Sequence, residues 1–548
     1  MIKNIDYSLL PGFSKLFIEF INNNPFFMQR FPANLTLLDS ANELKHKAEG
    51  FTLRDQLIPI ISKTMSKVTL SPLQISNRTA LNKSNSLAIV TGQQVGFLGG
   101  PLYTLYKAVS AIEQVRELNE KYKSDDLTFV PVFWVEDNDH DNLEASKLVL
   151  YDKDYNIHHI FCSNDTTKSD RTCVSEKMFN NEITQIIESI IHLLPESEHK
   201  SELSEKLRII YQPGKRWTDA FVELLNSWLG EFGLLFISAE DVRKAGAFAP
   251  LINKEFQQAG KSEESVNSAN QALEQTGFHI QAKVANINLF YHKDKNRYKI
   301  FRTSDSDSHF EILDENFSAN DFNLIIQNHP ERFSPNVILR NVFQDFVLPT
   351  AAYIAGPSEI GYIAQTKELY DYFGLKMPAI LPRHSFTIIT PRFDRFFSKQ
   401  ELKPDFFFRK FESIESVLLL QLKNIDLDLI VSDFIGTIEE QFEELNKHIT
   451  QIDKTLINSS KATEHKITEQ LQTLSKKALS VHKKQHTEYF GKYRQASNFF
   501  YPEGTMQERM FSPLNLISFF GEEKFIKLIL ESVKESSSKH LFVSLEKL

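Results

Sequence analysis

Cysteine is scarce in this chain of 548 residues, which contains only Cys162 and Cys173. Their surroundings lack the close spacing of a zinc site or of a Cys-x-x-Cys redox motif. So few cysteines are typical of a reducing compartment, because disulfide-rich chains are mostly secreted. We therefore expect a reduced, cytoplasmic setting.

Long apolar runs and a basic excess are also missing. No uncharged apolar run approaches the roughly 20 residues that a membrane helix needs. Charges and a Pro-Gly pair interrupt the N-terminus, unlike a secretory signal. The formal net charge of -9 argues against a general nucleic-acid binder, which usually has a basic balance. We expect a soluble globular protein with neither a membrane nor a nucleic-acid partner.

Residues 86–137 have the pattern of a strand, a helix and a second strand. SLAIVT and LTFVPVFWVED each predict a buried strand, and LYTLYKAVSAIEQVRELNEKY between them has apolar residues at helical spacing. A unit of this length implies a right-handed parallel βαβ arrangement. The fold class is therefore α/β. Residues 165–230 look like a helical insertion, and HIQAKVANINLFYH and NRYKIFR after it predict antiparallel strands.

A glycine-rich stretch, TGQQVGFLGGP, joins the first strand to the helix. Backbone amides in such a turn can approach an anion, and the helix N-terminus adds partial positive charge. Gln93 and Gln94 could donate hydrogen bonds to a phosphate. Neither common phosphate motif is matched, because Phe97 and Gln94 stand where each requires a glycine. A tight turn without a ligand explains the residues almost as well.

Acidic residues crowd the end of the second strand in WVEDNDHDNLEA. Ligands of open parallel sheets bind at such strand ends. The cluster could hold Mg²⁺, bind an ammonium group or act as a general base. We expect the charged form of His140 to be favoured, because it lies between Asp139 and Asp141. The alternatives are a solvated acidic loop or the Asp-x-Asp pattern of sugar-nucleotide glycosyltransferases, formed by Asp137 and Asp139.

A third cluster lies in AGPSEIGYIAQTKELY. Glu359, Tyr362 and Gln365 recur at spacings that place them on one helix face. Glu359 could instead only cap the helix. Arg340 and Arg383 lie near strand ends, where arginines suit carboxylate or phosphate recognition. The alternative is that both make ordinary surface ion pairs.

Two heptad patterns follow residue 430. Apolar residues from Ile438 to Leu456 and from Ile467 to Val481 alternate in steps of four and three, and INSSKATEH forms a polar break between them. This pattern predicts an antiparallel helical hairpin. Its charged remaining faces favour a projecting arm, and an arm with an apolar seam often dimerises. The alternative is a helix pair packed on the main body.

Six motifs together resemble one family, the cysteine ligases of bacillithiol biosynthesis (BshC). They are TGQQVGFLGGPLYTLYKA, PVFWVEDNDHD, ERFSPNVILR, AGPSEIGYIAQ, MPAILPR and YPEGTMQERMF. The resemblance implies a Rossmann-like parallel-sheet core with helical insertions and a C-terminal antiparallel coiled-coil arm linked to dimerisation. The expected domains are the N-terminal part of the core at 1–164, a helical connecting insertion at 165–230, the rest of the core with a mixed insertion at 231–395, the arm at 396–500, and a segment that packs back on the core at 501–548.

The resemblance also implies an activity, which is amide formation between the cysteine carboxylate and the amine of glucosaminyl malate. A carboxylate needs activation first, so ATP or ADP is the expected cofactor, and the acidic cluster could hold Mg²⁺. The expected nucleotide-binding residues are Gly92, Gln93, Gln94, Gly96, Gly99 and Gly100. The expected catalytic residues are Asp139, His140, Asp141 and Glu359. The expected substrate-binding residues are Tyr103, Gln365, Arg340 and Arg383.

Other interpretations remain open at this point. Lys107, two turns into the helix, is expected to lie too far away to reach the same phosphates. A sugar-nucleotide glycosyltransferase is the competing enzyme. A nucleotide-binding dimeric scaffold, with the arm as its functional part, is the non-enzymatic alternative.

Overall fold

A computed structural model describes residues 3–163, 170–302, 309–313, 315–422, 427–485 and 487–545. The chain forms two compact units. The main unit comprises Met1–Phe396 and Thr505–Leu548, and the arm unit comprises Phe397–Gly504. The boundary expected at residues 164 and 165 falls outside the described residues. Because the chain leaves the main unit and returns to it, its last segment belongs to the same unit as the α/β core.

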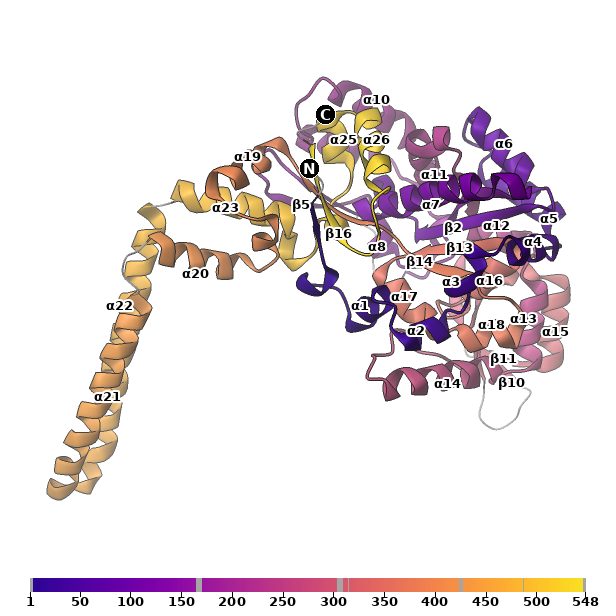
Figure 1. The fold of residues 1–548 in the computed structure, drawn as a ribbon. Helices are drawn as coiled ribbons and strands as arrows, with labels where there is room; N and C mark the ends of the chain where they lie inside the picture. The colour runs from indigo at the N-terminus through magenta and orange to yellow at the C-terminus, as the bar shows by residue number, and fades with distance from the viewer. Residues whose placement is uncertain are drawn as a thin grey trace. The chain divides into compact units, whose positions relative to one another are not determined.

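A five-stranded parallel sheet forms the centre of the main unit (Figure 1). Its order is β14-β13-β2-β3-β6. The strands are β2 (Ser86–Gln94), β3 (Thr128–Glu136), β6 (Leu235–Ser238), β13 (Thr350–Ala355) and β14 (Ala379–Pro382). The chain builds outward from β2 through β3 to β6 and then continues on the other side of β2 with β13. The strand order therefore reverses between β2 and β13, where ligands of open parallel sheets bind.

Helix α7 (Leu102–Lys121) connects β2 to β3 and confirms the predicted βαβ unit. Its inner face joins Leu87 and Ile89 of β2 and Phe129 of β3 in a shared apolar core. The first half of α7 is buried on nearly every side, although the sequence pattern indicates one apolar stripe. The added cover comes from β15 (Ser385–Ile389), α24 (Gln507–Met510) and α26 (Glu522–Ser532), which also contact α7.

Helices surround this core. Those before the sheet are α1 (Lys15–Ile21), α2 (Pro25–Arg30), α3 (Ala33–Thr36), α4 (Ala41–Glu49), α5 (Arg54–Thr64) and α6 (Pro72–Leu81). Those around the expected insertion are α8 (Asn142–Ser146), α9 (Ile183–Leu193), α10 (Lys200–Ile210) and α11 (Trp217–Leu229). Those that follow β6 are α12 (Ala239–Lys244), α13 (Ala249–Gln257), α14 (Lys261–Gln275), α15 (Ala319–Asn328), α16 (Arg340–Val347), α17 (Pro357–Ile363) and α18 (Lys367–Phe373).

Small sheets accompany the central one. Their strands are β4 (Lys147–Tyr151) with β5 (Ile157–Phe161), β7 (Leu289–Lys293) with β8 (Asn296–Lys299) and β12 (Phe333–Pro335), and β9 (Phe301–Arg302) with β10 (His309–Ile312) and β11 (Glu315–Ser318). The antiparallel β7–β8 pair confirms the second half of the predicted mixed section. Residues 279–288 are irregular, so the strand prediction was wrong there.

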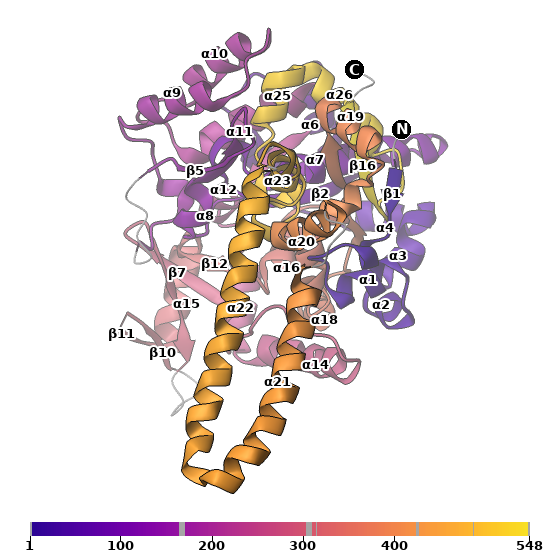
Figure 2. The same ribbon diagram turned by 90° about the vertical axis from the view of Figure 1, so that its left-hand side faces the viewer.

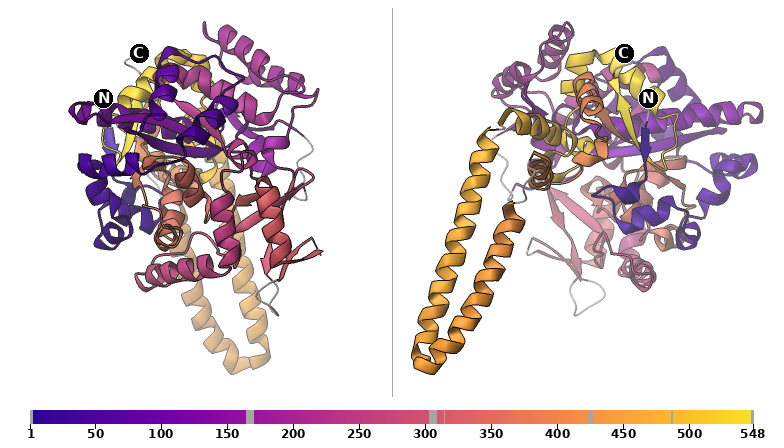
Figure 3. Two further views of the ribbon diagram at one scale, coloured as in Figure 1. Left: turned by 90° about the vertical axis from the view of Figure 1, so that its right-hand side faces the viewer. Right: turned by 60° about the vertical axis from the view of Figure 1, so that its left-hand side comes forward.

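The two ends of the described chain meet in one sheet. Strand β16 (His540–Ser544) pairs with β1 (Lys3–Ile5) on one side and with β15 on the other. Figure 3 shows the yellow C-terminal strand beside the indigo N-terminal segment. The remaining helix of this part, α25 (Leu514–Phe520), leads into α26. These pairings hold the final segment on the core of the main unit.

The arm unit contains the predicted helical hairpin. Helices α21 (Leu427–Ile452) and α22 (Ile457–Gln485) lie side by side in Figures 1 and 2. The turn lies at 453–456, because Asp453 accepts a hydrogen bond from the backbone of Thr455 and begins a short 3-10 helix. INSSKATEH is helical, so the predicted position of the break was wrong. The unit also contains α20 (Phe411–Leu422) and α23 (Thr487–Phe500), and α19 (Pro391–Gln400) leads into it.

Within the part of the chain that the structure describes, no helix is both long enough and apolar enough to span a membrane.

Candidate functional site

A pocket of about 310 Å³ opens at the carboxyl ends of the central strands, and we call it the main pocket. It is lined by Gly92, Gln93, Gln94, Tyr103, Lys107, Glu136, Asp139, Arg297, Pro335, Asn336, Val337, Arg340, Gly356, Pro357, Ser358, Glu359, Tyr362, Arg383 and Arg509. Many of these residues end or follow β2, β3, β13 and β14, so the pocket lies at the point where the strand order reverses. A second pocket of about 240 Å³ shares Gln93, Gln94, Tyr103 and Arg509 with it.

The glycine-rich stretch contributes to both pockets but is not one loop. Gly92, Gln93 and Gln94 are the last residues of β2, not of a loop as predicted. A Cβ atom at Gly92 would lie 2.9 Å from the carbonyl oxygen of Trp134, so only glycine lets β2 and β3 approach so closely here. Gly96 and Gly100 line the second pocket.

Gly99 was predicted to contact a nucleotide, but the structure places it elsewhere. It has φ +84°, and a Cβ there would lie 3.0 Å from the ring of Trp228. It lines neither of the two pockets. Gly99 therefore shapes the turn and packs against α11.

Lys107, Glu359 and Arg340 form a buried charge cluster in the main pocket. Lys107 forms an ion pair with Glu359 and donates to the carbonyl oxygen of Gly92 at 2.7 Å and to Gln93 Oε1 at 3.1 Å. Arg340 Nη2 lies 3.5 Å from Glu359 Oε1 and donates to Tyr362 Oη at 2.6 Å. Lys107 therefore contacts the glycine-rich stretch, and the expectation that it lies too far away to reach a bound phosphate stays a prediction. Its long side chain points back along α7, as helical side chains do.

Burial and ion pairing shift the pKa values of this cluster in opposite directions. Burial lowers the pKa of Lys107 to about 8, although Glu359 opposes the shift. Burial alone would raise the pKa of Glu359, but Lys107 and Arg340 hold it below its ordinary value. Glu359 also accepts from the backbone N–H of Gly356 at 2.7 Å. It therefore caps α17, as one interpretation predicted, and also lines the main pocket, where its predicted catalytic role stays a prediction.

The acidic residues after β3 lie in two different environments. Asp139 lines the main pocket, where Gln94 and Arg297 donate to its two carboxylate oxygens. Asp137 is 1% exposed and accepts from Ser238 Oγ at 2.7 Å and from the backbone of Glu240 at 2.9 Å. Burial raises the pKa of Asp137 to about 8. The two aspartates thus serve different sites, which argues against a shared Asp-x-Asp metal site.

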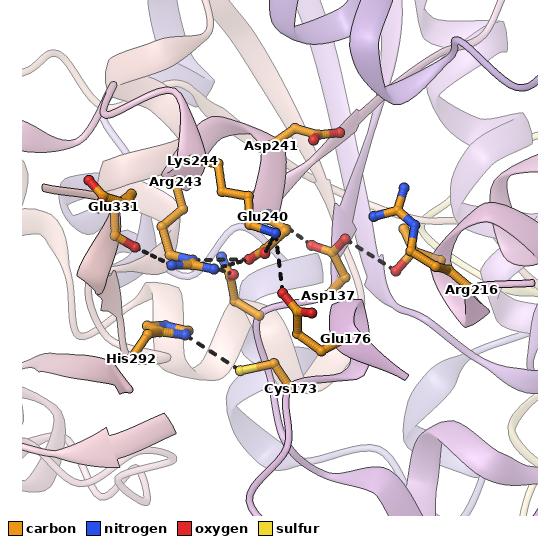
Figure 4. Close-up of polar contacts among 12 residues, drawn as sticks. Asp137, Cys173, Glu176, Arg216, Glu240, Asp241, Arg243, Lys244, His292 and Glu331 are labelled. Atoms are coloured by element: carbon orange, nitrogen blue, oxygen red, sulfur yellow. Dashed lines mark hydrogen bonds and ion pairs between the residues drawn. The ribbon is translucent and has the colours of Figure 1, made fainter. Parts of the chain in front are cut away.

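Figure 4 shows the network that Asp137 joins. Glu240 is paired with Arg243 and with Lys244, whose Nζ lies 2.6 Å from Glu240 Oε1. Arg243 Nε also donates to Asn138 Oδ1 at 3.0 Å. These contacts fix the end of β3 to α12 beside β6. The network therefore holds the strand end from which Asp139 reaches the pocket.

His140 and Asp141 lie outside the main pocket. Burial lowers the pKa of His140 despite the neighbouring Asp139, so the prediction that its charged form is favoured was wrong. Asp141 accepts from the backbone N–H of Glu144 at 3.1 Å and caps α8. Asp139 is thus the one member of the Asp-His-Asp motif that lines the pocket.

Glu136 belongs to the predicted acidic cluster and lines the main pocket, although it was not among the expected catalytic residues. It is the last residue of β3, and Trp134 Nε1 donates to its Oε2 at 3.1 Å. Burial raises its pKa, although Arg340 and Arg297 oppose the shift. A carboxyl group with a raised pKa is suited to proton transfer near neutral pH. Its position at the end of an apolar strand was the sequence signal that could have identified it.

Arg383 is positioned in the main pocket by a residue from the far end of the chain. Its guanidinium donates to Glu508 at 2.6 and 3.0 Å, and both side chains are almost completely buried. Glu508 also accepts from Ser385 Oγ at 2.9 Å and from the backbone of Phe386 at 3.1 Å. Arg383 lies 5.6 Å from the centre of the Tyr103 ring. Both predicted substrate residues, Arg383 and Tyr103, therefore line the pocket.

Gln365 does not share the face of Glu359 and Tyr362. Helix α17 ends at Ile363, and the amide of Gln365 donates to Asn270 Oδ1 at 2.7 Å and accepts from the backbone of Ala282 at 2.9 Å. Gln365 is fully buried and ties α14 to the segment after it. The predicted shared face was therefore wrong, because the helix ends before the periodicity does, and the assignment of Gln365 to substrate binding stays a prediction.

Arg297 and Arg509 are the cationic pocket residues that sequence reasoning missed. Arg297 comes from β8 in the mixed section, and Arg509 comes from the QERM segment after the arm. Neither follows a strand of the central sheet. QERM was among the motifs of the resemblance, but no chemistry had been attached to it.

Within the described residues, no group of three or more His, Cys, Asp or Glu side chains is arranged to hold a metal ion. Mg²⁺ commonly uses one or two carboxylates together with substrate phosphates and water. A Mg²⁺ ion bound through Asp139 or Glu136 and a nucleotide therefore stays a prediction.

Comparisons with known proteins agree with this architecture. Residues 2–384 match the family model of the BshC N-terminal Rossmann-like domain, and residues 386–545 match that of the BshC C-terminal coiled-coil domain. A relative from Salinibacter ruber is 31% identical over 441 residues, covering 80% of this chain and 79% of the relative. A relative from Chlorobaculum tepidum is 30% identical over 570 residues, covering 99% of each chain.

Both relatives are named "Putative cysteine ligase BshC". Those names agree with the predicted ligase class, and the resemblance drawn from the six motifs is confirmed. With its Rossmann-like and coiled-coil parts both matched, the chain belongs to the BshC family of bacillithiol biosynthesis.

Proposed function

We propose that this protein joins the carboxylate of cysteine to the amine of glucosaminyl malate, with ATP activating the carboxylate. The observation that carries the proposal is the charge of the main pocket. Five cationic side chains and three acidic ones line it. Cysteine, malate and ATP all present carboxylate or phosphate groups, which arginine and lysine bind well.

The reaction also needs an acceptor for a proton. Amide formation requires the amine to lose a proton as it attacks the activated carbonyl carbon. Glu136 is suited to accept it, because burial raises its pKa and no cation among the described residues forms an ion pair with it. Glu359 is less suited, because Lys107 and Arg340 already stabilise its ionised form. We therefore assign the general base to Glu136 and a positioning role to Glu359.

The two adjoining pockets are the proposed site of ATP. Its chemical contribution is to convert the carboxylate into an acyl phosphate or an acyl adenylate, which an amine can attack. Gln93 and Gln94 line both pockets, and Gly96 and Gly100 line the second one beside the N-terminus of α7. Backbone and helix-terminal charge of this kind favours phosphate groups. Lys107 lies within 2.7 Å of the carbonyl oxygen of Gly92 and supplies a buried positive charge nearby.

The test is reconstitution with defined components. Full-length protein is mixed with ATP, Mg²⁺, cysteine and glucosaminyl malate, and the product is measured by mass. We expect a product with the mass of bacillithiol and ATP consumption that depends on cysteine. A matched reaction contains a sugar nucleotide in place of ATP and tests the glycosyltransferase alternative. Absence of both product and cysteine-dependent ATP consumption contradicts the proposal.

A further inference from the structure

The cations of the main pocket differ in whether a protein carboxylate already neutralises them. Lys107 and Arg340 share Glu359. Arg297 Nη1 lies 3.1 Å from Asp139 Oδ1. Arg383 is held by Glu508. Each of these charges is committed to an internal partner, so an incoming anion must compete with a carboxylate for it.

Arg509 is different from the other four. Among the residues that the structure describes, its guanidinium has no hydrogen-bond or ion-pair partner, and the side chain is exposed. It lines both the main pocket and the second pocket. Its charge is therefore available to a ligand that occupies either one.

The backbone that carries Arg509 is firmly anchored. Its neighbour Gln507 is fully buried and accepts from the backbone N–H of Ile388 at 2.8 Å and donates to the carbonyl oxygen of the same residue at 3.2 Å. Glu508, the residue directly before Arg509, is paired with Arg383. Two consecutive buried side chains thus fix α24 against β15 and direct the third residue, Arg509, to the pocket mouth. An anchored backbone that carries an unpaired guanidinium is the arrangement expected of a binding residue.

A second polar group at this place also lacks a partner. Thr104, in the first turn of α7, lines the second pocket, is 1% exposed, and its buried hydroxyl oxygen has no hydrogen-bond partner among the described residues. Buried hydroxyl groups are normally paired. The N-terminus of α7 adds partial positive charge beside it. Glu144 and Lys147 line the same pocket with opposite charges, so neither sign dominates the rest of the wall.

We propose that Arg509 binds an anionic group of a substrate, a carboxylate or a phosphate, at the junction of the two pockets, with Thr104 as an additional hydrogen-bond donor. The inference rests on the proposed function and names the residue that selects for charge in the same site. Its position after the arm also means that residues from both chain segments of the main unit line the site.

The experiment compares Arg509→Ala and Arg509→Lys in the full-length protein. Arg116→Ala is the matched control, because Arg116 is an exposed arginine of α7 outside both pockets. We expect Arg509→Ala to raise the KM for one anionic substrate about tenfold to a hundredfold, as for loss of a charged hydrogen bond, with kcat within about threefold of the parent. Arg509→Lys should recover part of the loss, and Thr104→Val should cause a smaller rise.

The affected substrate identifies the anion. A rise in the KM for ATP assigns Arg509 to phosphate, and a rise in the KM for glucosaminyl malate assigns it to a malate carboxylate. An unchanged KM for cysteine, ATP and glucosaminyl malate in folded Arg509→Ala overturns the inference.

Direct binding separates this inference from the proposed function. Calorimetry with ATP and with L-malate compares the parent with Arg509→Ala and needs no turnover. Weaker binding of one anion by the variant supports the inference even if no ligation is found. Equal binding of both anions by the two proteins overturns it, and thermal unfolding of each variant checks that the fold is intact.

Discussion

At the scale of single residues, our proposal assigns proton transfer to Glu136 and not to His140. The sequence places both in one acidic run, and only their positions relative to the main pocket separate them. His140 lies outside the main pocket with a lowered pKa, whereas Glu136 lines the pocket with a raised one. The sequence does not indicate which of these two residues faces a ligand, because that depends on where the strand ends.

We predict that Glu136→Gln lowers kcat by a factor of about 10² to 10⁴, the usual contribution of a general base. A base acts in its deprotonated form, so kcat of the parent should rise as pH increases through the raised pKa of Glu136. In the variant that acidic limb should disappear. Steady-state kinetics from pH 5 to 9 measure both effects, and Glu117→Gln, at an exposed glutamate of α7, is the control. A variant that keeps the limb and the parent kcat removes Glu136 from the mechanism.

At the scale of elements, the end of β2 depends on close contact with β3. Gly92 faces the carbonyl oxygen and Cβ of Trp134 at 2.9 and 3.0 Å when a Cβ is built on it. We predict that Gly92→Ala destabilises the main unit by about 1–3 kcal/mol through overpacking and lowers activity. Denaturant unfolding and kinetics measure these effects.

The matched control for this substitution is Gly436→Ala in α21. Nothing lies within 4 Å of a Cβ at Gly436, and the residue is inside a helix. Alanine there should stabilise the arm unit by about 0.5–1 kcal/mol, because glycine is a poor helix former. Equal effects of the two substitutions would show that packing against Trp134 is not responsible for the loss.

Strand β16 supplies a pH-dependent contribution to stability. His540 is fully buried between Ser385 Oγ at 2.7 Å and Thr387 Oγ1 at 2.8 Å, and burial lowers its pKa to about 4 from the ordinary 6.5. The unfolded chain therefore binds the proton more tightly than the folded chain between these values. We predict that the free energy of unfolding falls as pH decreases from 6.5 to 4, by at most about 3 kcal/mol from this residue.

Denaturant unfolding of the main unit at pH 7, 6, 5 and 4 measures this slope. His540→Gln cannot titrate in this range, so it should lose stability at pH 7 but show a shallower decline below it. The same decline in the variant and the parent would assign the acid sensitivity to other groups.

At the scale of the whole molecule, the arm retains exposed apolar side chains after its hairpin has formed. Ile438 and Phe442 of the predicted seam are partly buried between the helices. Leu445, Leu474 and Val481 of the same seam are 46%, 63% and 56% exposed. We propose that a second copy of the arm covers them in a homodimer, because one hairpin cannot bury both sides of its seam.

We predict that Leu445→Asp combined with Leu474→Asp converts the protein to a monomer. Light scattering after size exclusion measures the mass of the full-length chain, and Glu440→Gln, at an exposed charged position of α21, is the control. An unchanged mass of the double variant places the dimer contact elsewhere. A monomeric parent at all concentrations contradicts the proposed dimer itself.

The sequence by itself determined the parallel βαβ unit, the hairpin and the family. Each depends on local periodicity or on several motifs in one order, and both kinds of signal are contained in the chain. It also identified most residues at the strand ends, including Gln93, Gln94, Glu359 and Arg383, because the carboxyl ends of parallel strands meet at one edge.

Only the tertiary structure decided which charges work together. Lys107 meets Glu359 because α7 and α17 begin at neighbouring strand ends, and Arg383 meets Glu508 although the arm separates them in sequence. Gln365, His140 and Gly99 do not line the main pocket, which no local pattern indicated. Burial and pairing are properties of segments brought together in space, so charge state and exposure cannot be obtained from the spacing of residues along one segment.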